Sequence, residues 1–300
     1  MPIGWLDSTA TDAREIYTRF CRGGPMRDSH RDRDSVTVAI IGAGEMGAAV
    51  GGRLREAGAR VSTSLSGRSA DSAARVRRVG LEVVNDDDLL VRDASFVLSI
   101  VPPGVAVEVA ERLRGPLDRA QIKPVYVECN AISPATCRRI RDLLGATSFI
   151  DAGIIGGPPP AGTQDPTRGP RFYASGPDAH LLTHLAGFGL DVAILDGPVG
   201  AASGLKLGYA GLTKGFTALL ATMLGATARE GLADALRAEL ARSQPNFLAW
   251  LDRAVPAMRP KAYRWVAEMQ QIAEFVGGPD DGAMIYDGAA RLYQRIANEH

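Results

Sequence analysis

Short apolar runs alternate with longer, more polar segments over the first two thirds of the chain. The clearest runs cover residues 36–41, 96–101, 125–129 and 149–151. Runs of this length that are apolar on both faces are typical of buried parallel strands, and the segments between them are long enough for helices. Further strands are expected at residues 61–66, 81–84, 171–174 and 193–196, helices at residues 71–79 and 105–113, and a helix or turn from residue 89 to 92. This alternation predicts an α/β fold built on a parallel sheet.

The pattern changes after residue 197. Alanine, leucine, arginine and glutamate dominate from Leu205 onward, and five helices are expected, at residues 205–227, 228–243, 246–255, 261–275 and 283–298. We therefore predict three parts. A partly flexible N-terminal extension covers residues 1–34, an α/β domain covers residues 35–197, and an all-α domain covers residues 198–300.

Composition narrows the classes of partner. The chain has 34 lysines and arginines against 34 aspartates and glutamates, so it has no overall field to attract nucleic acid or an anionic membrane. Its three cysteines, Cys21, Cys129 and Cys137, lack C-x-x-C spacing and are expected to be reduced thiols of a cytoplasmic protein. His180 and His184 lack the intervening glutamate of a metal-binding helix, so no metal site is predicted.

The motif around which the chain is organised comes directly after its first strand. Gly42, Gly44 and Gly47 have the spacing G-x-G-x-x-G, between an apolar strand and a helix. In a dinucleotide-binding fold the first glycine allows a tight turn, the second lets the backbone approach a pyrophosphate, and the third lets the helix pack on the strand. The turn and first helical residues expected to bind the cofactor are Gly42, Ala43, Gly44, Glu45, Met46 and Gly47. The first domain is therefore expected to be a Rossmann domain.

The segment after the second strand indicates which nicotinamide cofactor is preferred. An NAD-specific fold usually has an acidic residue there for the ribose 2′-hydroxyl, and this chain has none. Arg68 can pair with a 2′-phosphate, and Ser66 and Ser69 can donate hydrogen bonds to it. We therefore expect NADP(H) to be preferred over NAD(H), although a solvated Arg68 would leave the preference open.

Three later loops come after strands at the edge where ligands lie in such a sheet. Val101, Pro102 and Pro103 are expected to form a wall against the cofactor, although the prolines would also serve to stop the strand. Asn130 ends the next strand above the expected cofactor. Three residues on, Ser133 is both an N-cap candidate before Pro134 and a candidate for substrate binding. The turn at Gly156 and Gly157 has exposed N–H groups that can hold a carboxylate or phosphate.

Lys206 is the strongest candidate for acid–base chemistry. It lies one turn inside the first helix of the second domain, just after the domain junction. Ligand sites favour such junctions, and burial near a cofactor can lower the pKa of a lysine towards neutrality. From its position in the sequence alone, Lys206 would be expected to be an ordinary solvent-exposed lysine on the surface of a helix.

Three motifs in series resemble the β-hydroxyacid dehydrogenases. The segment IIGAGEMGAAVGGRLREAG resembles their cofactor motif, DAGIIGGPPPAG their substrate-binding motif, and GPVGAASGLKLGYAGLTKG their catalytic helix, whose lysine matches Lys206. The helical tail resembles the 6-phosphogluconate-dehydrogenase-like branch of NAD-binding proteins. The resemblance covers residues 36–300 and implies a Rossmann domain followed by a helical domain through which the chain forms a homodimer. It also implies that Lys206 carries the substrate proton, that Gly156 and Gly157 hold a substrate carboxylate, and that Asn130 lies near nicotinamide and substrate.

Two departures from the family pattern affect the expected substrate. Ala210 stands where the family usually has asparagine four residues after the lysine, and the hydroxyl of Tyr209 is a candidate replacement. Ile155 stands where the family usually has serine before the two glycines. The loss of both polar groups makes a true 6-phosphogluconate dehydrogenase improbable and indicates a bulkier or less charged substrate.

The sequence thus predicts an NADP(H)-dependent oxidoreductase. It would transfer hydride between the cofactor and a hydroxy or oxo compound, with Lys206, Asn130 and Tyr209 as the catalytic residues. Two alternatives stay open. One is an imine reductase of the same architecture, against which Lys206 argues, because imine reductases generally lack that lysine. The other is a cofactor-binding sensor without turnover.

Overall fold

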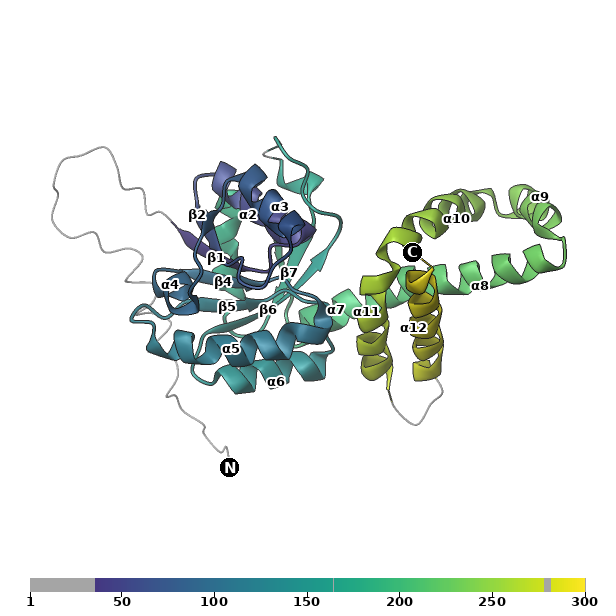
Figure 1. Ribbon diagram of the computed structural model, residues 1–300. Coiled ribbons are helices and arrows are strands. Elements are labelled where there is room, and N and C mark those ends of the chain that lie inside the picture. The colour runs from purple at the N-terminus through teal and green to yellow at the C-terminus, as the bar shows by residue number, and fades with distance from the viewer. Residues whose placement is uncertain (1–35, 164, 278–281, 300) are drawn as a thin grey trace, which may run out of the picture. The chain divides into compact units, whose positions relative to one another are not determined.

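The computed structural model describes residues 36–163, 165–277 and 282–299, and the predicted N-terminal extension with Cys21 lies outside them. The described strands form an eight-stranded sheet in the order β3-β2-β1-β4-β5-β6-β7-β8 (Figure 1). Neighbouring strands are parallel except for the antiparallel pair β6 and β7. The strands are β1 (Thr37–Ile41), β2 (Arg60–Thr63), β3 (Glu82–Val83), β4 (Phe96–Ser99), β5 (Val125–Glu128), β6 (Phe149–Ile155), β7 (Arg171–Ser175) and β8 (Asp191–Ile194).

Helices cover both faces of this sheet. Figure 1 shows α2 (Glu45–Glu56) and α3 (Ala70–Val79) on one side, and α5 (Ala106–Arg119) and α6 (Pro134–Leu144) on the other. The core beneath α5 and α6 is apolar and also includes residues of α4 (Asp87–Arg92). Three short 3₁₀ helices, η1 (Pro103–Val105), η2 (Pro166–Arg168) and η3 (Ala179–Phe188), lie in the connections. This is the predicted Rossmann-type α/β architecture, with buried parallel strands.

The strand register aligns the last residues of β1, β4 and β5 with Asp151, the third residue of β6. Ile41 of β1 pairs with Ser99 of β4, Ser99 with Glu128 of β5, and Glu128 with Asp151 of β6. Ligands of open α/β sheets bind outside this edge. The three polar residues of the row are all buried, so the sheet presents an unusual line of buried polar groups just below the candidate site.

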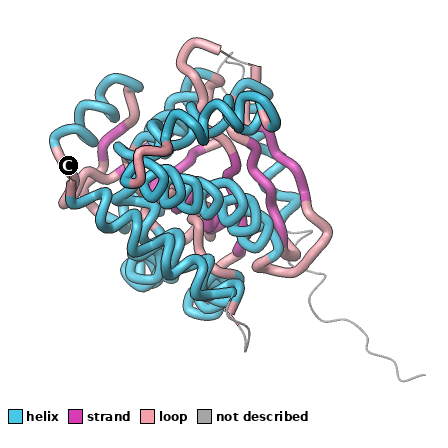
Figure 2. The backbone as a smooth tube through the Cα atoms, turned by 90° about the vertical axis from the view of Figure 1, so that its right-hand side faces the viewer, coloured by secondary structure: helices cyan, strands magenta, loops and turns pink. Residues whose placement is uncertain are grey.

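The rest of the chain is helical, as predicted. Its elements are α7 (Ala201–Ala210), the π-helical turn η4 (Gly211–Gly215), α8 (Phe216–Arg229), α9 (Ala233–Ser243), α10 (Pro245–Met258), η5 (Arg259–Lys261), α11 (Ala262–Val276) and α12 (Gly282–Asn298). Among the described residues, all strands come before Ala201 and all later elements are helices; Figure 2 draws strands in magenta and helices in cyan. Its core joins residues of α7, α8, α10, α11 and α12. No helix among the described residues is both long enough and apolar enough to cross a membrane.

Several helix boundaries differ from the predicted ones, for local reasons. The helix expected at residues 205–227 begins at Ala201 and is interrupted by the π turn. The next helix begins at Ala233 rather than residue 228, because Gly231 adopts φ +71° and turns the chain after α8. The segment that carries His180 and His184 is a 3₁₀ helix. Within the described ranges, no three histidine, cysteine or acidic side chains gather as metal ligands.

Candidate active site

The glycine turn between β1 and α2 has the geometry of a dinucleotide site. Gly42 has φ +109°, and a β-carbon there would lie 2.2 Å from the Ile100 carbonyl oxygen. A β-carbon at Gly47 would lie 1.9 Å from the Gly42 carbonyl oxygen, so α2 touches the turn directly. A β-carbon at Gly44 would meet no protein atom within 4 Å. The first and third glycines are therefore required by packing, whereas the second leaves open space.

That open space is suited to an anion. No side chain caps the N-terminal end of α2, whose free N–H groups and positive dipole end favour a phosphate. Ala43 is fully buried, Met46 is partly buried, and Glu45 is exposed on the first turn of the helix. The turn therefore fits the pyrophosphate of a dinucleotide, held by backbone groups rather than side chains.

The loop after β2 carries the residues predicted to select NADP(H). The strand ends at Thr63, whose hydroxyl donates to the Ile40 carbonyl oxygen over 2.7 Å. Ser66 and Arg68 come next, on an exposed turn. Ser69 caps α3, because its hydroxyl accepts a hydrogen bond from the Ser72 N–H at 3.3 Å. The Arg68 side chain is thus exposed to solvent near the end of β2. The Ser69 hydroxyl oxygen already accepts a hydrogen bond from the first turn of α3.

Asn130 ties together the ends of two central strands. Its carbonyl oxygen accepts a hydrogen bond from the Val101 N–H at 2.6 Å, and its amide nitrogen donates to the Ser99 hydroxyl at 3.0 Å. Both halves of the carboxamide are thus engaged, and they fix the start of the turn through Pro102 and Pro103. The predicted wall residues Val101, Pro102 and Pro103 are therefore braced by Asn130 itself.

Lys206 of α7 reaches the same place from the helical part. Its Nζ donates to the Cys129 carbonyl oxygen at 3.2 Å, next to Asn130. Burial lowers the pKa of Lys206, the carboxyl groups of Glu268 and Glu128 oppose this shift, and the Lys214 charge adds to it. The structure thus brings together Lys206, Asn130 and Val101 from three separate segments.

Two features of β6 hold α7 in this position. Asp151 is fully buried and accepts four hydrogen bonds: from the Ser175 hydroxyl (2.9 Å), the Gly200 N–H (2.9 Å), the Ser203 N–H (3.1 Å) and the Ser203 hydroxyl (2.6 Å). Its carboxylate therefore caps the N-terminal end of α7, where a negative charge is favourable. Two residues further on, a β-carbon at Gly153 would lie 2.7 Å from the Ala202 carbonyl oxygen and 3.2 Å from Lys206 Cβ. Only glycine lets the helix approach the strand this closely.

A second buried acid lies beside the site. Glu128 is 1% exposed; one of its carboxyl oxygens accepts a hydrogen bond from the Asn130 N–H at 3.0 Å. Its other oxygen and the nearby Tyr126 hydroxyl are buried without a hydrogen-bond partner among the described residues. Burial raises the pKa of Glu128 to about 8, against the lowering effect of Asn130 and Lys206. At neutral pH this carboxyl group is therefore mainly protonated.

Helix α11 supplies residues that the sequence analysis missed. Arg264 lies 3.7 Å from the Glu45 carboxylate and so brings a guanidinium to the N-terminal end of α2. Glu268 forms an ion pair with Lys214 of the π turn. Charged residues on an amphipathic helix are usually solvated, so no sequence pattern distinguished these from their neighbours.

The remaining predicted residues differ in burial, from Ser133, which is 1% exposed, to the exposed Tyr209. Ser133 caps α6 as predicted, and its hydroxyl also donates to Glu274 of α11 at 2.9 Å. Gly156 has φ +129° and packs against Pro170, whereas a β-carbon at Gly157 would meet nothing within 4 Å. Tyr209 is 55% exposed, and Ala210 is buried in the core of the helical part. Tyr209 therefore points away from the protein interior rather than joining the Lys206 group.

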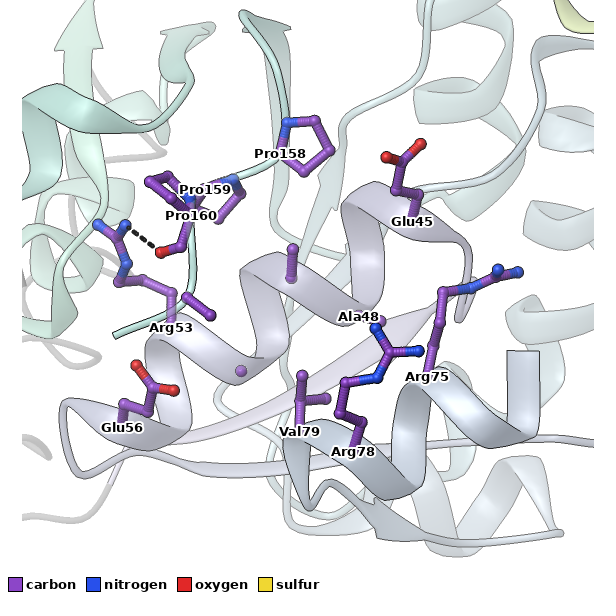
Figure 3. Close-up of a pocket in the computed structure, with 13 residues that line it drawn as sticks. Glu45, Ala48, Arg53, Glu56, Arg75, Arg78, Val79, Pro158, Pro159 and Pro160 are labelled. Atoms are coloured by element: carbon purple, nitrogen blue, oxygen red, sulfur yellow. Dashed lines mark hydrogen bonds between the residues drawn. The ribbon is translucent and has the colours of Figure 1, made fainter. Parts of the chain in front are cut away.

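A shallow pocket of about 200 Å³ lies elsewhere, over the outer side of α2. Its lining comes from α2, α3 and the proline run after the glycine turn of β6, and Arg53 donates to the Pro160 carbonyl oxygen across it (Figure 3). Arg53 is buried and also donates to the carbonyl oxygens of Asp165 and Gly189. This arrangement fixes the loop after Gly157 to α2, and neither Lys206 nor Asn130 lines the pocket.

Comparison with known proteins agrees with this architecture. Residues 37–180 match the NAD binding domain of 6-phosphogluconate dehydrogenase, and residues 228–296 match a domain of unknown function, DUF1932. The conserved protein MTH1747, of unknown function and described as structurally similar to 3-hydroxyacid dehydrogenases, is 30% identical with a TM-score of 0.65. The match covers 88% of this chain and 97% of that one.

Two further relatives cover most of the chain. An uncharacterized 28.5 kDa protein of Methanothermus fervidus is 28% identical over 199 residues, which are 66% of this chain and 74% of that protein. A 3-hydroxyisobutyrate dehydrogenase of Mycobacterium tuberculosis, solved with L-serine, shares the fold at 19% identity and a TM-score of 0.65, over 89% of this chain and 95% of that one. The chain belongs to the β-hydroxyacid dehydrogenase-like superfamily. This membership supports an oxidoreductase with an NAD(P)-binding domain.

Proposed function

We propose that this protein is an NADP(H)-dependent oxidoreductase of hydroxy or oxo compounds in which Lys206 is the general acid–base. The observation that carries the proposal is the position of Lys206. Its partly buried amine bonds the Cys129 carbonyl oxygen beside Asn130, at the edge of the sheet that the glycine turn also occupies. Burial lowers the pKa of Lys206, which eases the loss of its proton and so suits this amine to proton exchange with a substrate.

The chemistry divides between the cofactor and the chain. A bound nicotinamide supplies or accepts the hydride. In the reducing direction the Lys206 ammonium gives its proton to the substrate oxygen as the carbonyl carbon gains hydride, which leaves a neutral amine and an alcohol. In the oxidising direction the neutral amine takes the hydroxyl proton as the carbon loses hydride. Asn130 acts on the site by holding Val101 and the turn after it.

The substrate would be held at the other side by the turn after β6. Gly156 is fixed by its contact with Pro170, and the exposed Gly157 has no neighbour where a side chain would be. A carboxylate or other anionic group could therefore approach its backbone N–H. We assign Gly156 and Gly157 to substrate binding, and Tyr209 and Ser133 stay predictions that substitution must test.

The preference for NADP(H) is supported by the loop after β2. Arg68 is exposed there, and no acidic residue occurs between Thr63 and Ala70. We expect Arg68→Ala to weaken NADPH binding about tenfold and to leave NADH binding unchanged, because only NADPH carries the 2′-phosphate. Fluorescence titration of both cofactors measures this. Arg60→Ala, at an exposed position on the opposite end of the same strand, is the matched control. Equal losses for both cofactors would contradict the assignment.

A homodimer through the helical part is supported by an exposed apolar stripe on α7 and α8. The stripe consists of Leu205, Tyr209, Leu212, Phe216, Leu219 and Met223, which are between 41% and 75% exposed. Leu212 lies in the π turn between the two helices, and exposed apolar side chains gathered in this way are typical of a protein–protein interface. We expect Leu212→Glu combined with Leu219→Glu to give a monomer in sedimentation, whereas Ile122→Glu, at an exposed apolar position of the α/β part, leaves the dimer intact. A wild-type monomer would contradict this assignment.

The experiment that tests the proposed function is NADPH oxidation, followed at 340 nm, against a panel of oxo acids, aldehydes, ketones and cyclic imines. Turnover of a carbonyl compound is the expected result. Turnover of imines alone would contradict the proposal and favour an imine reductase. NADPH binding without turnover on any compound would favour a sensor.

A further inference from the structure

The helix that carries Lys206 is irregular at one place, and the irregularity brings a second lysine towards it. Lys214 is eight residues further on, within the π turn Gly211–Gly215. At about 100° per residue, a regular α-helix would place Lys214 roughly 80° around the axis from Lys206. The π turn accommodates one extra residue and rotates the later residues back by about 100°, to within roughly 20° of Lys206. The π turn thus sets both lysines on one face.

The π turn is held by its neighbours. Tyr286 of α12 packs against both of its glycines: a β-carbon at Gly211 would lie 3.0 Å from the Tyr286 hydroxyl oxygen, and one at Gly215 2.9 Å from its ring. The hydroxyl of Tyr293 donates to the Lys214 carbonyl oxygen. The irregular turn is therefore a packed part of the helical core.

The Lys214 side chain contacts two residues of α11. Its Nζ donates to the Glu268 carboxylate and lies 5.2 Å from the centre of the Trp265 ring. Glu268 is only 7% exposed, so this ion pair is largely out of water. A buried pair of this kind stabilises little compared with an apolar pair of the same size, so its presence calls for another explanation.

The pair acts electrostatically on Lys206. The ionisable groups that influence Lys206 are Glu268 from α11, Lys214 from the π turn, Glu128 at the end of β5 and Cys129 directly after it. Glu268 is the strongest of the influences that raise the pKa of Lys206, and Lys214 lowers it. The two partners of the ion pair therefore have opposite effects on the same amine.

We propose that Lys214 and Glu268 are positioning residues for Lys206, in which Lys214 holds the Glu268 carboxylate and so prevents it from pairing with Lys206. This proposal rests on the proposed function, because it explains how Lys206 stays free to exchange a proton. With Glu268 released, Lys206 would form the ion pair instead and keep its proton.

The test measures the protonation of Lys206 without turnover. Lysines of the full-length protein are labelled with trace acetic anhydride at several pH values, and Lys206 is quantified by mass spectrometry against Lys261, an exposed residue of η5. Only the neutral amine reacts. At neutral pH we expect Lys214→Met to slow Lys206 labelling about tenfold and Glu268→Gln to speed it several-fold, because one pKa unit is a tenfold change in neutral amine.

Two further variants keep the result interpretable. Lys214→Arg retains the ion pair and should label Lys206 as the wild type does. Lys214→Met combined with Glu268→Gln removes both charges, restores labelling to near the wild-type rate, and avoids the unpaired buried charge that could unfold either single variant. Circular dichroism verifies folding. Unchanged Lys206 labelling in the folded Lys214→Met variant, or a double variant as slow as Lys214→Met, would overturn the proposal.

The outcome is separable from that of the proposed function. If the labelling shifts as expected but Lys206→Ala retains full turnover, the ion pair controls Lys206 and the proposed catalytic role of Lys206 is wrong. If Lys206→Ala abolishes turnover but the labelling does not shift, the catalytic role stands and the inference about Lys214 and Glu268 is wrong.

Discussion

At the glycine turn the candidate active site consists of backbone, whereas around Lys206 it consists of ionisable side chains removed from water. At the turn, Gly42 and Gly47 touch neighbouring carbonyl oxygens so closely that one extra carbon would collide with them. Around Lys206, the buried carboxyl groups of Glu128 and Glu268 and the amine of Lys214 influence the protonation of the Lys206 amine. The first region is sensitive to added atoms and the second to lost or unpaired charge, so different substitutions test each.

The largest effect is expected at the glycine turn. Gly47→Ala places a methyl group against the Gly42 carbonyl oxygen and should lower the free energy of unfolding by about 3 kcal/mol or more. Gly44→Ala meets no protein atom, so its stability should stay near that of the wild type while NADPH binding weakens about tenfold or more, because the methyl group occupies the space expected for pyrophosphate. Thermal denaturation and cofactor titration measure the two effects. Wild-type affinity for NADPH in the Gly44→Ala variant would contradict the expectation that the space beside Gly44 holds the pyrophosphate.

A somewhat smaller effect is expected where β6 holds α7. Asp151→Asn keeps the shape of the side chain and one oxygen for the N–H groups of Gly200 and Ser203, but it removes the negative charge that caps α7 and turns an amide donor towards the Ser203 hydroxyl. We expect a loss of about 3 kcal/mol in denaturant unfolding. Asp142→Asn, which removes an exposed carboxylate paired with Arg141, should change stability by no more than about 0.5 kcal/mol. If Asp151→Asn and Asp142→Asn lowered the free energy of unfolding equally, the buried Asp151 cap would contribute no more to stability than an exposed ion pair.

The third effect concerns Glu128 and depends on pH, so that it is the smallest of the three near pH 5. The pKa of this carboxyl group is raised by burial from 4.5 to about 8, so the folded state holds a proton that the unfolded state releases. The stabilising contribution is therefore complete below pH 4.5 and is lost as pH rises towards 8, by up to about 1.4 kcal/mol per pH unit.

Glu128→Gln removes the titrating group and should flatten this part of the stability profile. The variant should match the wild type near pH 5 and exceed it in stability near pH 8. Glu111→Gln, at an exposed position on α5, is the control and should leave the profile unchanged. A Glu128→Gln variant that loses stability with rising pH as steeply as the wild type would contradict a protonated Glu128.

The contrast between the two regions also explains which features the sequence could predict. Strand, glycine spacing and helix lie within residues 37–56, so local pattern was enough to predict the turn and the packing roles of Gly42 and Gly47. The fold class could be predicted from the same kind of local pattern. The role of Asp151 as the cap of α7 joins residues about 50 positions apart, and no local pattern contains it.

The charges around Lys206 were less predictable still. Its position near a strand end was expected from the domain junction and from resemblance, and its hydrogen bond to Cys129 fits that expectation. Glu268, Lys214 and Arg264 looked like ordinary charges on amphipathic helices, because the pattern of a helix does not tell which polar residue faces a partner domain. The π turn was missed because its composition, GLTKG, continues a helical pattern.

The central claim is most directly tested by replacing Lys206 with alanine and measuring turnover and cofactor affinity on the same preparation. With the compound identified by the NADPH oxidation panel, we expect kcat to fall by about 10²–10⁴, the usual scale for a lost acid–base group, while the Kd for NADPH is unchanged. Lys261→Ala, an exposed lysine of η5, should leave both values as in the wild type. Wild-type turnover in Lys206→Ala would contradict the account.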